Sequence, residues 1–252
     1  MSISIHNEHR PWPIPRRSWI MKQTWNDLLF AHWPVHVEQL RKYIPLPLTI
    51  DTYDDYAYLG IVAFTMNQIQ PRGLPVVAYV STLSEINLRT YVSLDGKAGV
   101  YFFSLDASQW LAVEVARKFF HLPYFHTDVQ VSLHNKNALE YHSIRRDRRG
   151  PSGEFHATYQ PVSEVYNALP HTLEHWLTER YCLYTNTHKH IYRGEIAHSP
   201  WPLQQARADL HLNTLADGFG IELPWISPIL HFAKSLDVLI WSLEQVRSIE
   251  LD

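Results

Sequence analysis

The clearest alternation of polar and apolar positions in the chain spans residues 85–92. Its odd positions are polar or amphipathic, and three of its four even positions are apolar, which is typical of a β-strand whose two faces meet different surroundings. Asp95-Gly96 follows, a dipeptide that favours a two-residue turn, and a second β-rich run comes after it. The pattern therefore predicts a hairpin over residues 84–106.

The register of this hairpin decides which side chains meet across it. If Asp95 and Gly96 take the two central turn positions, the opposed pairs on one face are Glu85 with Asp106, Asn87 with Ser104 and Arg89 with Phe102. A three-residue loop with a bulge would shift this register by one residue. The sequence leaves both registers open.

Other segments show strand-like and helix-like patterns in turn. Leu111, Val115 and Phe119 recur at four-residue spacing and predict an amphipathic helix over residues 108–120. Short helices are also predicted at 35–44 and 170–177, a hairpin over 48–66, a meander at 125–133, 138–145 and 154–162, and later strands at 181–185, 191–198, 203–212 and 238–246. The sum is a mainly β, α+β fold built on an antiparallel sheet.

The domain organisation follows from the length and from the first segment. Residues 1–20 mix Pro, Arg and Trp without periodicity, which predicts a loosely docked N-terminal arm. A chain of 252 residues without an internal repeat is within the range of one all-β domain. We therefore predict a single domain over residues 21–252.

Composition and charge exclude several classes of protein. The 22 Lys and Arg residues stand against 25 Asp and Glu, a net charge of −3, so no long-range field attracts nucleic acid or an acidic membrane. The apolar stretch 226–243 is interrupted by charged residues, and the first ten residues lack an apolar signal segment. The single cysteine, Cys182, cannot close an internal disulfide. These features predict a cytoplasmic protein with no nucleic-acid or membrane partner.

The polar face of residues 85–92 has two interpretations. One is the solvent-facing side of a half-buried sheet. The other places the face inside a barrel, where the opposed carboxylates of Glu85 and Asp106 would raise the pKa of one of them and Arg89 could hold an anionic ligand. Alternation alone does not separate the two.

The segment HTLEH matches the inverted zinc-protease pattern, with His171 and His175 four residues apart and Glu174 beside the second. A working site needs a third ligand, and the neighbouring sequence offers no convincing one. Surface histidines on a short helix explain the match more simply, so a zinc hydrolase is the weakest hypothesis and no metal is expected. The sequence contains no serine-hydrolase elbow, phosphate-binding loop or dinucleotide-binding loop.

Six long segments of the chain carry a resemblance to a known family. They read TWNDLLFAHWPV, DTYDDYAYLGIVAFTM, EINLRTYV, GVYFFSLDAS, LTERYCLYT and HSPWPLQ. Together they resemble the YqjF-like family of bacterial proteins of unassigned function, within the acetoacetate decarboxylase-like superfamily. The resemblance implies a cone-like barrel with a closed internal cavity and a few short flanking helices. Since members of the superfamily assemble into larger complexes, the resemblance also leaves a homo-oligomer open.

The same resemblance implies where a site would lie. In decarboxylases of the superfamily, a strand glutamate precedes a hairpin, a helix with an arginine, and a Pro-Lys-Lys run whose first lysine forms a Schiff base with a β-keto acid. This chain resembles that order with Glu85, Arg117 and Pro123, but the run reads Pro-Tyr-Phe, so Tyr124 stands at the lysine position. Because a phenol cannot form an imine, the resemblance implies the cavity without Schiff-base chemistry and without a cofactor.

The implied cavity favours the inward interpretation of the polar strand face. Catalysis is assigned to Glu85, Asp106 and Tyr124, and substrate binding to Asn87, Arg89 and Arg117. The two carboxyl groups would share or move a proton, an arginine would bind a carboxylate or enolate, and the tyrosine would donate a hydrogen bond where the imine nitrogen otherwise lies. Arg180 is a further candidate for the cavity wall, although Glu179-Arg180 also suits an internal ion pair.

Two main hypotheses of function result. The first is an enzyme that performs lysine-independent acid/base chemistry, of a lyase or isomerase kind, on a small organic acid or carbonyl compound. The second is a barrel that binds or senses such a small-molecule ligand and catalyses nothing. Proton exchange from a keto acid distinguishes them, because only the enzyme accelerates it.

Overall fold

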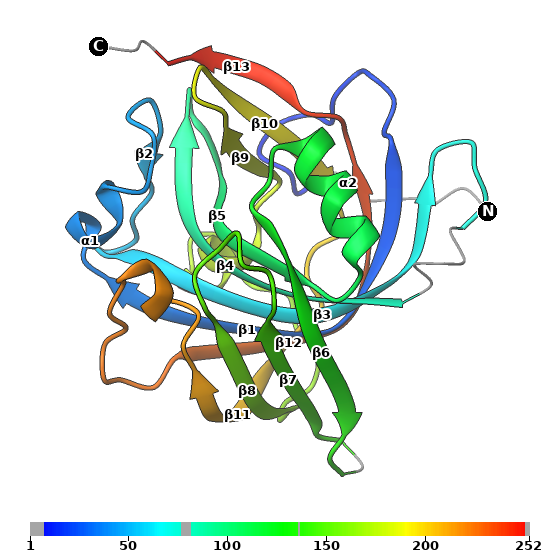
Figure 1. Ribbon diagram of the computed structural model, residues 1–252, viewed down its shortest axis with the longest axis vertical. Helices are drawn as coiled ribbons and strands as arrows, with labels where there is room; N and C mark the ends of the chain where they lie inside the picture. Colours follow the sequence, from blue (N-terminus) through cyan, green and yellow to red (C-terminus); the bar gives the residue numbers. More distant parts are fainter. Residues whose placement is uncertain (1–7, 77–81, 136, 250–252) are drawn as a thin grey trace.

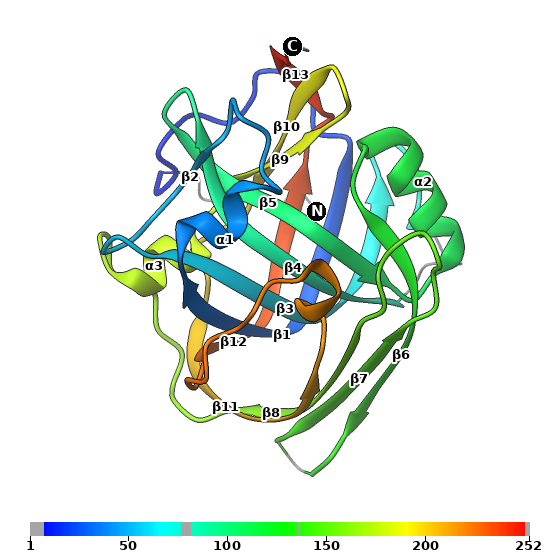
Figure 2. The same cartoon turned by 60° about the vertical axis from the view of Figure 1, so that its left-hand side comes forward.

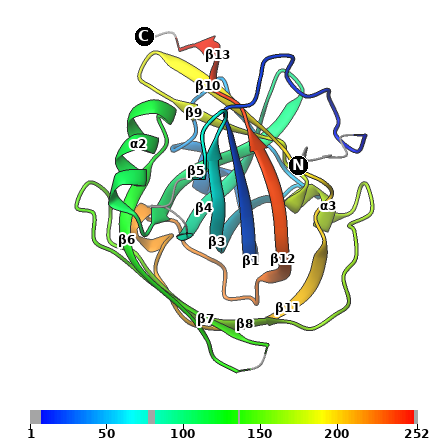
Figure 3. The same cartoon turned by 90° about the vertical axis from the view of Figure 1, so that its right-hand side faces the viewer.

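Two closed rings of β-strands share one curved sheet (Figures 1, 2 and 3). The computed structural model describes residues 8–76, 82–135 and 137–249, so the first seven residues of the predicted arm lie outside it. The shared strands are, in spatial order, β12 (Ile229–Ile240), β1 (Met21–Val35), β3 (Ala57–Pro71), β4 (Thr82–Leu94) and β5 (Lys97–Ala107). Every pairing within this sheet is antiparallel.

The first ring closes through β9 (Cys182–Asn186) and β10 (His190–Ala197). Strand β5 pairs in parallel with β9, β9 pairs with β10, and β10 pairs with the end of β12. Strand β13 (Glu244–Ser248) is added to β10. Helix α2 (Trp110–Phe120) lies against this ring, on the right of Figure 1. The helix ends near the predicted position because His121 adopts a left-handed conformation and Pro123 follows.

The second ring closes on the opposite side of the shared sheet. It consists of β6 (Tyr124–Leu133), β7 (Leu139–Arg145), β8 (Glu154–Pro161) and β11 (Leu203–Asn213), which connect β5 to β12. Strands β6 to β8 form the predicted meander. With the five shared strands they make a closed nine-strand barrel, so the mainly β barrel is confirmed, with parallel pairing only where β5 meets β6 and β9 among the described residues.

The remaining elements are short. They are α1 (Val37–Arg41), β2 (Thr49–Ile50), α3 (Leu173–Thr178) and a 3₁₀ turn at Asp217–Phe219. None of the helices in the described parts of the chain combines the length and apolar composition that a bilayer span requires.

Alternate residues of the shared sheet face two different interiors. Leu29 and Ile61 belong to a large buried apolar cluster that includes Phe155 of the second ring. Phe30 and Phe64 belong to a separate cluster on the other face. Because both faces of β1 and β3 are apolar, their sequences show little alternation, and β4 carries the clear polar stripe.

The predicted hairpin over residues 84–106 is confirmed, but its predicted register holds only near the turn. Arg89 lies opposite Phe102 as predicted, and a β-bulge beside Arg89 shifts the rest of the hairpin by one residue. The predicted pairs that this shift breaks are Glu85 with Asp106 and Asn87 with Ser104. Asp106 lies opposite Ile86 instead. Since side chains alternate along a strand, Asp106 and Glu85 point to opposite faces of the sheet, and the prediction that they face each other is wrong.

Two other predicted segments pair differently. The hairpin over residues 48–66 does not form, because β2 pairs with β4. Its turn is nevertheless present, with Asp54 and Asp55 in left-handed conformations. The strand predicted at 238–246 is divided between two strands, because β12 ends at Ile240 and β13 begins at Glu244. Local propensity located these strands, whereas their partners depend on the closed sheet around them.

The described part of the N-terminal arm is anchored to the first ring. The buried Arg10 guanidinium lies 3.2 Å from Oε2 of Glu195 on β10, and Trp12 Nε1 donates to the same oxygen at 2.9 Å. Lys97 Nζ lies 3.1 Å from the other oxygen of Glu195. The arm is therefore attached next to the turn of the central hairpin.

Candidate functional site

A cavity of about 480 Å³ occupies the interior of the first ring. Side chains from β1, β3, β4, β5, β9 and α2 line it, and most of them are apolar. The polar side chains that reach it are Gln23, Glu85, Asn87, Arg89, Tyr124, Thr178 and Arg180. The polar face of β4 thus points into a cavity and not into solvent.

Strand register orders the cavity side chains by depth. Along β4 the inward residues are, in order, Leu83, Glu85, Asn87 and Arg89. Their partners on the antiparallel strand β3 start with Met66, opposite Leu83, and end with Gly60, opposite Arg89. We call the Leu83 end the rim of the cavity and the Arg89 end its floor. An apolar zone at the rim is therefore followed by a carboxyl group, an amide and a guanidinium.

Gly60 makes room for the floor. A Cβ atom at this position would lie 2.8 Å from Cδ2 of His32 and 3.5 Å from Cγ of Arg89. Since the ring of His32 is fully buried, it could not retreat without displacing its neighbours. The missing side chain allows the histidine and the arginine to lie against the same strand.

Glu85 and Tyr124 form the central polar pair of the cavity. Glu85 is only 3% exposed, and the Tyr124 hydroxyl donates to its Oε2 at 2.9 Å. Asn87 Nδ2 donates to Oε1 at 3.4 Å. Burial raises the pKa of Glu85 to about 7, although the two hydrogen bonds oppose that rise. Burial and the neighbouring carboxylate raise the pKa of Tyr124 well above its ordinary value, so the phenol stays a donor.

Arg89 supplies positive charge at the floor. Its guanidinium lies 5.7 Å from the ring centre of Phe30 and 5.8 Å from that of Tyr91. Its Nε is buried without a hydrogen-bond partner, and it forms no ion pair within the described part of the chain. An uncompensated guanidinium in an apolar cavity favours an anionic ligand.

Arg180 brings a second guanidinium to the same cavity. It stacks 4.3 Å from the ring centre of Trp176, and its Nη1 donates to Asp51 at 2.6 Å. Its Nη2 is buried without a partner among the described residues. The predicted ion pair with Glu179 is not the one that forms, because Glu179 instead accepts a hydrogen bond from the backbone of Trp201. The alternative prediction, that Arg180 reaches the cavity, is the one the geometry supports.

A buried pair behind Arg89 fixes the floor. Nε2 of His32 lies 2.8 Å from the hydroxyl of Tyr91, which donates to the carbonyl of Leu177 at 2.8 Å. Burial and the positive charge of Arg89 lower the pKa of His32 well below its ordinary value. A neutral histidine at this position adds no second charge to the floor.

Arg117 does not reach the cavity. Its Nη1 donates to the backbone carbonyl of Tyr124 at 2.7 Å, and its guanidinium lies 5.5 Å from the ring centre of Phe125. It lies behind the wall because α2 turns this position away from the cavity. Arg117 is therefore placed to position Tyr124, and the predicted contact with a ligand has no geometric support.

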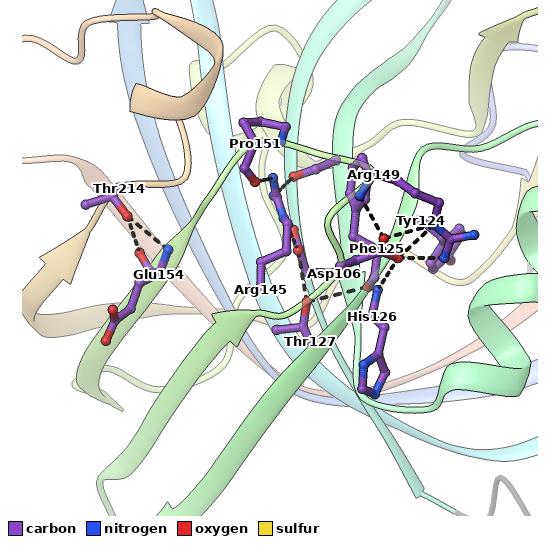
Figure 4. Close-up of polar contacts among 12 residues, drawn as sticks. Asp106, Tyr124, Phe125, His126, Thr127, Arg145, Arg149, Pro151, Glu154 and Thr214 are labelled. Atoms are coloured by element: carbon purple, nitrogen blue, oxygen red, sulfur yellow. Dashed lines mark hydrogen bonds and ion pairs between the residues drawn. The ribbon is translucent and has the colours of Figure 1, made fainter.

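The side chain of Asp106 contacts Thr127 of β6 and Arg145 of β7 in the second ring (Figure 4), and it is not among the residues that line the cavity. Its oxygens accept from Nε and Nη2 of Arg145 at 2.5 and 2.7 Å and from Thr127 at 2.9 Å. The β-bulge in the hairpin causes this placement. The predicted sharing of a proton between Asp106 and Glu85 is thus replaced by a pair formed with Tyr124.

Among the described residues that line the cavity there is no lysine. Tyr124 occupies the cavity wall at the position where the resemblance implied an imine-forming lysine. Lys97 is paired with Glu195 outside the cavity. Cys182 also lines the cavity, but burial raises the pKa of its thiol to about 12, which disfavours the nucleophilic thiolate.

The HTLEH segment does not form the predicted helical arrangement. Helix α3 begins at Leu173 after the N-cap Thr172, and His171 precedes it with a φ of 70°. The two histidines therefore do not share one helix face. Glu174 accepts from Tyr166 and lies 3.4 Å from His231. In the ranges that the structure describes, no group of three or more His, Cys, Asp or Glu side chains is placed to hold a metal ion.

Three cavity residues escaped the sequence analysis. Thr178 at the end of α3 and Gln23 on β1 add polar atoms to the wall, and Ala116 presents a small side chain from α2. No local pattern marks them, because they meet only after the first ring has closed.

Comparison with known proteins identifies relatives of the chain. A family model, DUF2071, described as an uncharacterized conserved protein, matches residues 22–237. The chain is 47% identical over 232 residues to the uncharacterized protein YqjF of Bacillus subtilis (strain 168), which covers 92% of this chain and 95% of that protein.

Solved structures show where else this fold occurs. An acetoacetate decarboxylase-like enzyme from Sphingomonas wittichii RW1 matches with a TM-score of 0.64 at 10% identity, covering 95% of this chain and 98% of that one. The enduracididine biosynthesis enzyme MppR, in complex with pyruvate, matches with a TM-score of 0.63 at 9% identity over 93% of both chains. The acetoacetate decarboxylase of Legionella pneumophila matches with a TM-score of 0.58 at 13% identity over 98% of both chains. These similarities show a shared acetoacetate decarboxylase-like fold.

Proposed function

We propose, from the premise that this chain belongs to the YqjF-like family of uncharacterized conserved proteins with an acetoacetate decarboxylase-like fold, that it is an acid/base enzyme. Its substrate would be an organic acid that carries a carbonyl group. Glu85 would move the proton, Tyr124 would assist it, and Arg89 would bind the carboxylate. No Schiff base takes part, because the cavity wall has a phenol where an amine would be needed.

The observation that carries this proposal is the Glu85 and Tyr124 pair. A carboxyl group whose pKa is about 7 is available both as acid and as base near neutral pH. Such a shift requires burial, which the protein maintains at a cost in stability. Arg89, whose buried Nε has no partner among the residues that the structure describes, lies two inward positions further along the same strand.

The chemistry follows from the order of these groups. With the substrate carboxylate on Arg89, ionised Glu85 removes a proton from the carbon next to the carbonyl, and the electron pair moves to the carbonyl oxygen. Once protonated, Glu85 accepts the Tyr124 hydrogen bond less strongly, so this hydroxyl can donate to the enolate oxygen. The carboxyl group of Glu85 then exchanges this proton with solvent, and return of a solvent-derived proton from Glu85 to the carbon completes the hydrogen exchange and regenerates the ionised carboxylate.

The test is hydrogen exchange on a short 2-oxo acid. In D₂O, we expect the protein to accelerate loss of the proton next to the carbonyl, followed by NMR, and Glu85→Gln to slow this exchange at least tenfold. Gln keeps the size and can still accept from Tyr124, but it cannot carry the proton. Glu140→Gln on β7 is the matched control, because the Glu140 side chain is partly exposed and bonded to His156, and it should leave the rate unchanged.

The outcome also decides between the two hypotheses. Binding of the acid to a folded protein without accelerated exchange would favour the non-catalytic binding or sensing barrel. Equal rates for the unmodified protein and for Glu85→Gln would rule out the role of Glu85.

A second prediction concerns the pKa of Glu85. Tyr124→Phe removes the hydrogen bond that stabilises the carboxylate, so the pKa of Glu85 should rise above about 7. Hydrogen bonds to charged groups are worth about 1.5–3 kcal/mol, which corresponds to roughly one to two pKa units. The pH profile of exchange should move upward by that amount, and an unmoved profile would show that Tyr124 does not act on Glu85.

A further inference from the structure

We infer that the ligand of this cavity is an elongated amphiphilic acid. Its carboxylate binds at the floor, and its apolar chain runs past Glu85 to the rim beneath α2. This inference rests on the proposed function and adds to it the class of substrate: a carbonyl-bearing acid with a medium-length acyl or arylalkyl chain, longer than a keto acid of a few carbons.

Apart from Gln23 on β1, the polar groups that reach the cavity are gathered toward one end. From the floor upward they are the guanidiniums of Arg89 and Arg180, then the amide of Asn87, then the carboxyl of Glu85. Two of these side chains keep unused donors in Nε of Arg89 and Nη2 of Arg180, and Asn87 keeps an unused acceptor in Oδ1, within the described part of the chain. Buried polar atoms of this kind favour a ligand that carries the complementary groups.

The rim, by contrast, is mostly apolar, and the polar side chain that its described walls carry is Gln23 of β1, whose Oε1 accepts from Nε1 of Trp25 at 2.8 Å. On the shared sheet, Leu83 lies opposite Met66, and Met66 lies opposite Trp25. Leu111 and Val115 of α2 complete this part of the cavity. A short hydrophilic acid would leave these surfaces without a partner, whereas an apolar chain removes them from water.

The dimensions of the cavity fit a chain of moderate length. The seven residues from Leu83 to Arg89 span about 20 Å of strand, and the arginine side chain fills the lower part of that depth. The remainder accommodates an extended chain of roughly eight to twelve carbons. The volume of about 480 Å³ is within the range of roughly 300–1,000 Å³ typical of pockets for larger organic ligands.

Helix α2 marks where the far end of the chain emerges. Leu111 and Val115 line the cavity, yet they are 49% and 46% exposed, so the same side chains contact the cavity and the solvent. Beside them, the small residues Ala112 and Ala116 also line the cavity. Figure 3 shows α2 lying along the side of the barrel, next to β6. The opening is therefore bordered by apolar side chains, as an apolar tail requires.

The experiment is a chain-length series measured by isothermal titration calorimetry with butanoate, octanoate and dodecanoate below their micellar concentrations. Each methylene removed from water should tighten binding about threefold to fourfold. Octanoate should therefore bind about 100-fold more tightly than butanoate. Dissociation constants within threefold of each other for these two acids would overturn the inference, and this measurement needs no variant.

Affinity measurements on variants test where the two ends of the ligand bind. Ala116→Phe fills the rim, so it should reduce the advantage of octanoate over butanoate at least tenfold. Lys118→Ala, at an exposed position of the same helix, is the matched control and should change neither affinity. Arg89→Met should weaken both acids by the same factor, and unaltered octanoate binding in this variant would contradict a carboxylate at the floor.

Failure of this inference is distinguishable from failure of the proposed function. A flat chain-length series together with exchange that depends on Glu85 would overturn the inference alone. A steep series without exchange from any keto acid would support the amphiphilic ligand and overturn the catalytic proposal.

Discussion

Replacing Asp106 with alanine is expected to lower the free energy of unfolding by about 3–5 kcal/mol, because a buried arginine would lose its charge partner. Asp106 and Arg145 are both buried, and two hydrogen bonds of 2.5 and 2.7 Å join them. The Arg145 guanidinium also donates to Ser104 and lies 4.7 Å from the ring centre of Phe125. It is therefore held in place and could not turn toward water. Urea denaturation followed by circular dichroism measures the change.

A matched control separates burial from charge. Asp128 on β6 and Arg146, which directly follows β7, form an ion pair at 2.7 Å. Both side chains are more than half exposed. Asp128→Ala should cost less than about 1 kcal/mol, because solvent screens an exposed pair. Asp106→Ala combined with Arg145→Met should recover part of the lost stability, since no unpaired charge stays buried. Equal losses for Asp106→Ala and Asp128→Ala would contradict the argument.

The position of Asp106 shows how far the sequence determines the site. The turn at Asp95-Gly96 was predictable because its conformational preference is local. The bulge was not predictable, because no local pattern marks it and the partner that Asp106 then meets, Arg145, comes from another strand. One residue of shift moved Asp106 from the cavity into that ring, while Glu85 kept its inward orientation.

Helix α2 shows a second limit of sequence patterns. The spacing of Leu111, Val115 and Phe119 correctly predicted a helix, and it normally marks the face that packs on a core. Here these residues are about half exposed or more, and Val113 is the residue of α2 that is buried. The helix borders a cavity instead of a solid core, and periodicity does not distinguish those two surroundings.

Sequence patterns predicted the cavity-lining residues best where those residues come from a single strand. Glu85, Asn87 and Arg89 share a face of β4 whatever the rest of the chain does. Arg117 was misplaced, because its spacing specifies a helix but not the side of that helix that faces the cavity. The family resemblance supplied the hollow barrel itself, which alternation in a single strand could not.

Glu85→Gln is expected to make the protein more stable at pH 8 and to leave its stability nearly unchanged at pH 4. In the folded protein the pKa of Glu85 is about 7, against an ordinary value of 4.5. Below pH 4.5 the carboxyl group is protonated in both the folded and the unfolded chain, so it makes no difference. Between pH 4.5 and 7 the unfolded chain ionises first, and stability falls. Above pH 7 the full cost is reached, about 3 kcal/mol from the shift of the pKa. Gln fills the same space without this cost.

The measurement is the difference in unfolding free energy between Glu85→Gln and the unmodified protein at pH 4, 6 and 8. Buried histidines such as His32, whose pKa is lowered, destabilise the fold as the pH falls, but they contribute equally to both proteins and cancel in this difference. Glu140→Gln is the control with the opposite sign. A hydrogen bond from His156 lowers the pKa of Glu140, so its replacement should reduce stability slightly at pH 8. If the difference for Glu85→Gln were independent of pH, Glu85 would titrate normally, and the argument that burial prepares it for proton transfer would fail.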